Sequence, residues 1–185
     1  MKKFLKRMLI VVVSLVVLFI VGCKVLMTQT KKHSPEQTEV FKNNDLEITV
    51  KYSQPSKKER EIFGGLVPYG EVWRTGANEP TTFSTNKALR IEGQDLPEGT
   101  YSLWTIPERE SWTVIFSSGQ YDWGVSWGNK ASRLPEDDVL NVVVPSQNTT
   151  EEVEKFTIDF ANEPNRMQLY WDHTIITLGF ESAIK

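Results

Sequence analysis

Residues 67–85, VPYGEVWRTGANEPTTFST, place several chemically capable side chains in one short span between glycines and prolines. Arg74 offers a planar fork of five N–H donors, and Glu79 offers a carboxylate acceptor. Asn78 tolerates a left-handed backbone, as loop residues often must. Together these three side chains suit a polar ligand that carries hydroxyl or carboxylate groups, so they are candidate ligand-binding residues.

The same span has a purely structural interpretation. Residues 71–75 and 81–85 have the composition of two strands, and the five residues between them would close a hairpin. In that hairpin an Arg74–Glu79 ion pair would hold the loop, while Trp73 would point into the core. Both interpretations are open at this stage.

A second candidate surface lies at residues 120–133, QYDWGVSWGNKASR. Trp123 and Trp127 stand among glycines and polar residues, which predicts a long loop. Flat amphipathic rings outside a core often form contact surfaces, here one suited to a sugar or a peptide. The alternative is that the loop folds over one end of the domain and buries its own rings.

Other catalytic chemistry is scarce. The chain has two histidines, His33 and His173, and one cysteine, so it predicts no His/Cys metal site and no cofactor. The sequence has no H-E-x-x-H motif, no G-x-S-x-G elbow and no phosphate-binding glycine loop. A carboxylate pair formed by Glu79 and an aspartate could hydrolyse a glycoside, but no spacing identifies the partner.

The elements that must position these residues are short strands. Alternating or apolar runs separated by turn residues predict strands at 46–52, 102–106, 112–116, 139–144, 156–160, 167–171 and 174–180. Few helices and many strands predict an all-β fold, an antiparallel β-sandwich of jelly-roll or Greek-key type. Leu96-Pro-Glu-Gly-Thr-Tyr101 is similar to a tyrosine corner, which makes Tyr101 structural. One short helix is expected at Ser56–Phe63.

The N-terminus predicts membrane targeting. A basic MKKFLKR segment precedes an apolar run that begins at Met8. The run ends in Gly22-Cys23, which fits a lipoprotein signal with Cys23 as the lipidated residue. Val25 to Met27 extend it to a length of about 20 residues, which also fits a transmembrane anchor. In both cases the basic end stays in the cytoplasm and the remainder lies outside it.

We divide the chain into the targeting segment 1–27, a polar stalk 28–44 and a β-domain 45–185. A short capped helix is possible at 34–37 within the stalk. Residues 28–185 hold 16 basic and 24 acidic residues, a net charge of −8. An acidic domain without a basic cluster is a poor nucleic-acid partner, so nucleic-acid binding is excluded.

REIFGGLVPYGEVWRTGANEPTTFST, DLPEGTYSLWTIP, SWTVIF and a terminal W-D-x-T together resemble the DUF2911 family of exported bacterial domains of unknown function. The resemblance covers about residues 45–182. It departs from the family pattern at Pro80, where Ala is usual, and at His173, where Asn or Lys is frequent. The resemblance implies a polar signature of Arg60, Arg74, Asn78, Glu79, Thr81 and Thr82.

The sequence thus predicts a membrane-anchored binding module without enzymatic activity, whose partner is a glycan, lipid, small molecule or protein of the cell envelope. The candidate ligand-binding residues are the six signature residues with Trp123 and Trp127. A carboxylate-based hydrolase using Glu79 and a purely structural envelope protein are the alternatives.

Overall fold

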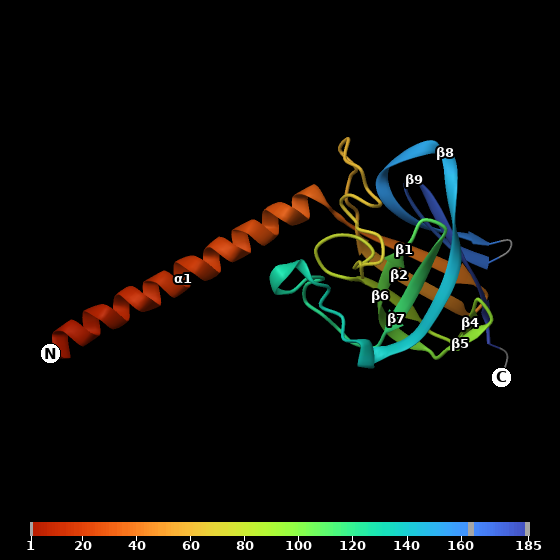
Figure 1. The fold of residues 1–185 in the computed structure, drawn as a ribbon. Helices are drawn as coiled ribbons and strands as arrows, with labels where there is room; N and C mark the ends of the chain where they lie inside the picture. Colours follow the sequence, from red (N-terminus) through yellow and green to blue (C-terminus); the bar gives the residue numbers. More distant parts are fainter. Residues whose placement is uncertain (1, 163–164, 184–185) are drawn as a thin grey trace. The chain divides into compact units, whose positions relative to one another are not determined.

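The computed structural model of the chain describes residues 2–162 and 165–183. It divides into two compact units, one up to His33 and one from Ser34 onward (Figure 1). The first unit is a single helix and the second is a β unit. Each unit is described by itself.

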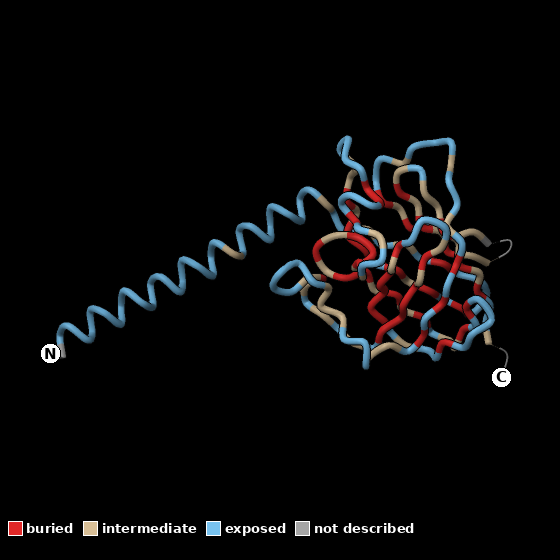
Figure 2. Tube along the Cα trace, viewed as in Figure 1, coloured by how far each residue is buried: buried red, intermediate tan, exposed pale blue. Residues whose placement is uncertain are grey.

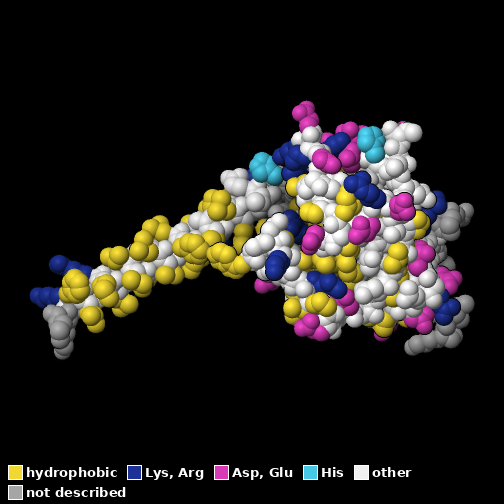
Figure 3. Space-filling view, in the orientation of Figure 1, with side chains coloured by type: hydrophobic (Ala, Val, Ile, Leu, Met, Phe, Trp, Pro, Cys, Tyr) yellow, Lys and Arg dark blue, Asp and Glu magenta, His cyan; other side chains and the backbone are white. Residues whose placement is uncertain are grey.

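Helix α1 spans Lys2–His33. Its surface is apolar along most of its length, with basic side chains near the N-terminal end (Figure 3). Lys31, Lys32 and His33 in its last turn are favourable next to the negative end of the helix dipole. By length and composition α1 can cross a membrane, as an anchor or as a signal sequence. The predicted apolar helix is therefore present, and it extends beyond Met27.

Pro35 stops the helix because the residue before a proline is disfavoured in the α region. Strand β1 (Glu36–Asn43) follows directly and pairs with β2 (Leu46–Ser53) along its whole length. The turn is Asn44-Asp45, with Asn44 at φ 53°, as a two-residue hairpin turn requires. The capped helix expected at 34–37 is wrong, and residues placed in a stalk instead form the first strand.

The β unit is one antiparallel sheet with the strand order β1-β2-β3-β6-β7-β8-β9-β4-β5. The other strands are β3 (Thr81–Thr85), β4 (Leu89–Ile91), β5 (Gln94–Leu96), β6 (Gly99–Pro107), β7 (Ser111–Ser117), β8 (Asp138–Asn162) and β9 (Asn165–Ser182), with 3-10 turns η1 (Trp127–Asn129) and η2 (Pro135–Asp137) between β7 and β8. The predicted antiparallel all-β class is confirmed. Division into two stacked sheets is not, since the strands form one open sheet.

The long strand β8 lets this sheet enclose a core. Its first part pairs with β7, and from Ser146 onward it pairs with β9, with two register shifts on the way. As a result β1 lies against β8, although they are far apart in the strand order. Phe41 on β1 meets Phe180 on β9 edge to face, with 5.0 Å between ring centroids. The buried residues gather inside this curled sheet (Figure 2).

Two local predictions have clear outcomes. The tyrosine corner is confirmed, because the Tyr101 hydroxyl donates to the Pro97 carbonyl at 2.9 Å. The helix expected at Ser56–Phe63 is wrong. Lys58 and Glu59 have φ of 51° and 58°, and the Lys57 N–H bonds to the Glu154 carbonyl on β8 at 2.7 Å. Pairing with β8 therefore takes precedence over local helix propensity.

Candidate functional site

The polar turn, defined here as residues 72–81, is not half of a hairpin. Trp73 exchanges backbone hydrogen bonds with Thr105 on β6, at 2.7 and 2.9 Å, instead of pairing with β3. Thr75 and Asn78 have φ of 55° and 60°, and Gly76 has φ of 152°. These backbone conformations turn the chain sharply into β3. The hairpin predicted from 71–75 and 81–85 is therefore wrong.

Hydrogen bonds from the side chains of Trp73, Asn78 and Thr81 hold this turn together. The Trp73 indole donates to the Gly76 carbonyl at 3.0 Å, and the Thr81 hydroxyl donates to the Thr75 carbonyl at 2.5 Å. The Asn78 amide donates to the Ser34 carbonyl and the Ser53 hydroxyl, at 3.3 and 3.4 Å. Thr81 and Asn78 are buried. Their hydrogen-bonding capacity is used largely by the fold.

Arg74 is half-buried beneath the aromatic loop, defined here as residues 120–134. Gly124 leaves room for the Arg74 stem, since any side chain at Gly124 would collide with its Cβ, Cγ and Cδ atoms. The buried Nε of Arg74 has no hydrogen-bond partner among the described residues. Removal from water lowers the pKa of the guanidinium. Arg74 is thus a partly desolvated cation packed against a loop.

The aromatic loop is fastened at its base. The Gly124 N–H donates to the Asn78 carbonyl at 2.9 Å, which joins this loop to the polar turn. The Tyr121 hydroxyl donates to the Asp137 carboxylate and accepts from the Leu134 N–H, both at 3.0 Å. The Tyr121 ring meets the buried Trp104 edge to face. The two segments selected from the sequence are therefore in contact.

A pocket of about 340 Å³ opens where these segments meet β1, β2 and β3. Its charged lining residues are three carboxylates and one ammonium group: Glu36, Glu79, Asp122 and Lys51. The remaining lining residues are Tyr52, Ser53, Pro80, Thr82 and Tyr121. Hydrogen-bonding groups on several walls and a net acidic lining suit a ligand rich in N–H or O–H donors.

The predicted candidates thus separate into groups. Glu79 and Thr82 line the pocket, whereas Arg74, Asn78 and Thr81 lie in or under the polar turn. Trp123 is half-buried and Trp127 is exposed. Glu36 and Lys51 were missed because their places on the pocket wall follow from the β1–β2 register, which needs the hairpin at Asn44-Asp45 to be identified first.

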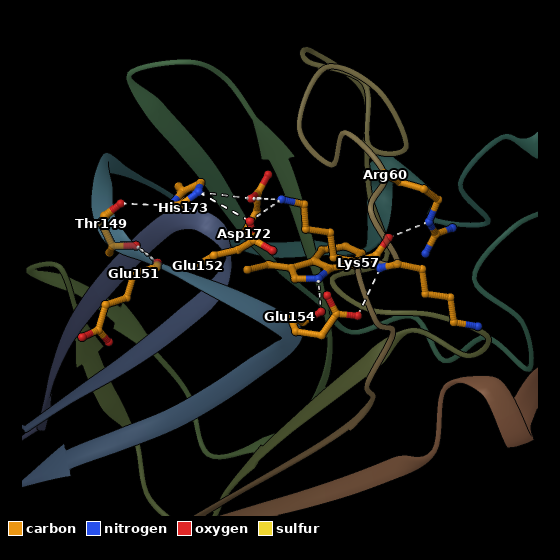
Figure 4. Close-up of polar contacts among 10 residues, drawn as sticks. Lys57, Arg60, Thr149, Glu151, Glu152, Glu154, Asp172 and His173 are labelled. Atoms are coloured by element: carbon orange, nitrogen blue, oxygen red, sulfur yellow. Dashed lines mark hydrogen bonds and ion pairs between the residues drawn. The ribbon is translucent and has the colours of Figure 1, made fainter.

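Arg60 lies elsewhere. Its guanidinium donates to the Lys57 carbonyl at 2.9 Å (Figure 4) and to the Ser56 carbonyl at 2.6 Å, so it holds its own loop. Next to it, the Lys57 ammonium lies 2.7 Å from Asp172 and 3.0 Å from Glu152. Hydrogen bonds to Asp172 and Glu152 raise the pKa of Lys57.

His173 belongs to this second cluster. Its Nδ1 lies 3.2 Å from the Thr149 carbonyl and its Nε2 lies 3.7 Å from Glu152 (Figure 4). Glu152, Asp172 and His173 offer ligand atoms within 4.8 Å of one another, as a cation site would. The Lys57 ammonium already pairs with both carboxylates, so this arrangement is an ion-pair network joining the 57–60 loop to β8 and β9.

These features define a class of protein: an antiparallel β domain with a small polar pocket, preceded by an apolar helix that can cross a membrane. The chain belongs to the family described as protein of unknown function (DUF2911), whose pattern matches residues 34–180. The match begins where the β unit begins. Comparisons with curated proteins and with solved structures find no match to this chain.

Proposed function

We propose that the β unit is a binding module without enzymatic activity that takes a polar, donor-rich ligand in the pocket beside the polar turn. The observation that carries this proposal is the lining of that pocket, with Glu36, Glu79 and Asp122 set against a single Lys51. Carboxylates accept hydrogen bonds from sugar hydroxyls and from ammonium groups. An anionic ligand would meet a net negative wall.

The size of the pocket limits the ligand. A volume of about 340 Å³ lies near the lower end of the range of about 300–1,000 Å³ typical of small-molecule sites. One sugar ring, an amino sugar or a short amine-bearing peptide end fits that range. We infer a glycan or peptide unit of the cell envelope as the ligand class.

The proposed place of action follows from α1. Its N-terminal end carries Lys3, Lys6 and Arg7, and the apolar part of the helix contains no acidic residue. Under the positive-inside rule this end stays in the cytoplasm and the β unit lies outside it. Whether Cys23 is lipidated or α1 stays intact is decided by the mass of the mature N-terminus.

The test is a thermal-shift screen of the purified full chain in detergent. The panel contains neutral oligosaccharides, amino-sugar oligomers, short peptides and acidic sugars as counter-examples. A ligand at 100 times its Kd stabilises the native state by about 2.7 kcal/mol, which gives a clear rise in Tm. We expect neutral or amine-bearing compounds to raise Tm and acidic sugars not to.

Two variants place the ligand. Glu79→Gln and Lys51→Met should weaken the shift, whereas Glu98→Gln, an exposed carboxylate in the turn before β6, should leave it unchanged. Equal shifts in all three variants would place the ligand outside this pocket. No shift with any donor-rich compound would contradict the proposed ligand class.

A carboxylate-based hydrolase is the second candidate. It is favoured by the presence of Glu36 and Asp122 in the same pocket as Glu79, since a glycosidase needs two carboxylates across the scissile bond. Product analysis of every ligand found in the screen separates the two. Turnover that Glu79→Gln abolishes while binding persists would establish the enzyme. Bound but intact ligand supports the binding module.

A further inference from the structure

Trp127 is the most unusual apolar residue of the β unit. Its side chain is 98% exposed, whereas Val143, the next most exposed large hydrophobic residue of the described β unit, is 66% exposed. A tryptophan ring buries a large apolar area wherever it binds, so leaving it in water forgoes stabilisation. A tryptophan ring, apolar with one N–H donor, suits a contact outside this chain where one side is apolar and the other is wet.

The tip of the aromatic loop, which carries Trp127, is a folded turn. The Ser126 N–H and hydroxyl both donate to the Lys130 carbonyl, at 2.8 and 3.2 Å, and Val125 bridges to Ala131. Gly128 and Asn129 take φ of 78° and 60°, which reverses the chain directly after Trp127. The Trp127 turn, defined here as residues 125–131, therefore has a fixed backbone that carries the exposed ring. A preordered backbone loses less entropy on binding than a mobile loop.

The charge of the tip differs from that of the unit that carries it. Residues 34–185 contain 14 basic and 24 acidic residues, a formal net charge of −10. The Trp127 turn contains one charged residue, Lys130, and no acid. An anionic surface would repel much of the β unit but not this turn. Tryptophan beside a lysine is the pairing found at membrane–water interfaces.

The tether keeps the β unit close to a bilayer. At 1.5 Å per residue, the apolar part of α1 from Met8 to Met27 spans about 30 Å, which matches the hydrocarbon core. Six further helical residues and the two residues Ser34-Pro35 lead to β1, adding at most about 16 Å. The headgroup region takes up about 5–7 Å of that. If α1 spans the bilayer, the chain length between its apolar part and β1 lets β1 begin no more than about 11 Å beyond the headgroups.

We infer that the Trp127 turn is a second membrane contact, inserting its ring among the lipid headgroups of the bilayer that holds α1. The occupant is the lipid surface itself, with Trp127 at the interface and Lys130 facing anionic headgroups. A domain with one membrane anchor can rotate about it, whereas a second membrane contact defines which face of the domain lies on the membrane. The inference rests on the proposal that α1 is retained as an anchor.

The test uses the full chain in vesicles of mixed phosphatidylcholine and phosphatidylglycerol, with and without bromine on the acyl chains near the headgroup. Bromine quenches only tryptophans that enter the lipid. The difference in emission between wild type and Trp127→Phe isolates Trp127. We expect bromine to reduce this difference at least about twofold, as for an interfacial ring. The rest of the emission should change little because Trp73, Trp104, Trp112 and Trp171 are buried.

Trp123→Phe is the matched control, since Trp123 is in the same loop but half-buried, and this variant should keep the bromine-sensitive emission. The inference would be overturned if the intensity of Trp127 emission were unchanged by brominated lipid but reduced by acrylamide dissolved in the water. A shift of this emission on addition of soluble oligosaccharide without any bromine effect would also overturn it, since that would make the tip a glycan contact. A mature protein from which α1 has been cleaved would not float with the vesicles. That result would contradict the anchor proposal rather than the inference about Trp127.

Discussion

The polar turn and the aromatic loop were both selected from the sequence as candidate binding segments, but the structure uses their side chains differently. The polar turn is rich in ligand-type side chains, yet Asn78 and Thr81 are buried and bonded to the backbone of this same chain. The aromatic loop is rich in core-type rings, yet Trp127 is almost fully exposed. Side-chain chemistry alone therefore does not decide whether a residue serves the fold or a partner.

The largest expected effect on stability comes from replacing Trp73 in the polar turn, which is compared below with Trp127 in the aromatic loop. Trp73 is buried, lies 5.8 Å from Trp171 in a stacked arrangement, and donates to the turn it precedes. Trp73→Ala should lower the free energy of unfolding by about 3–5 kcal/mol, the usual cost of removing a buried aromatic ring. Urea unfolding of the full chain in detergent measures it. A loss below about 1 kcal/mol would mean that the turn is not anchored through the core.

Gly76→Ala tests the backbone of the polar turn. A Cβ on Gly76 would lie 2.9 Å from the Ser53 carbonyl, at a φ of 152° that side chains rarely adopt. We expect a loss of about 1–3 kcal/mol in the same unfolding measurement. Gly93→Ala is the control, since Gly93 also has a positive φ but faces open space. Equal losses at the two positions would show that the contact with Ser53 carries no cost.

Arg74→Met tests whether the buried guanidinium serves the fold. Methionine keeps an unbranched stem against Gly124 and removes a cation whose Nε has no partner among the described residues. Stability should be unchanged or rise by about 1 kcal/mol, since burying a poorly paired charge costs free energy. Arg90→Met, in an exposed pair with Asp95, is the control and should lose less than about 1 kcal/mol. A large decrease in the free energy of unfolding of Arg74→Met would show that Arg74 stabilises the fold.

Trp127→Ala should have the smallest effect on folding. Surface substitutions away from special features change stability by less than about 0.5 kcal/mol. With its 98% exposed ring, Trp127 fits that class. The measurement is again urea unfolding, now in detergent without lipid. A loss comparable to that of Trp73→Ala would mean that the ring packs inside the β unit, and the contrast between the two regions would disappear.

Much of the sheet was predictable because strand signals are local. Alternation and turn residues located most strands, and the Tyr101 corner follows from six consecutive residues. The first strand was missed because β1 is an edge strand that buries only Phe41 deeply. Its identity depends on pairing with β2, which a single weak pattern does not reveal.

The site was less predictable because it depends on contacts between distant segments. Trp73 pairs with Thr105, about thirty residues away, so no local rule excludes the expected hairpin. The burial of Arg74 depends on Gly124, and the pocket depends on Glu36 and Lys51 facing Glu79. Residue types identified Glu79 and Thr82, but only the register of the sheet supplies their neighbours.

The position of β4 also sets the order in which the newly made chain can fold. Leu89 and Ile91 on β4 are buried, but β4 pairs with residues 180–182 at the end of β9, about ninety residues later in synthesis. Until those last residues leave the ribosome, this short hairpin has an open edge and an uncovered apolar face. Sheet completion therefore waits until the last residues of β9 have been made, and loss of β9 would leave an aggregation-prone chain rather than a smaller domain.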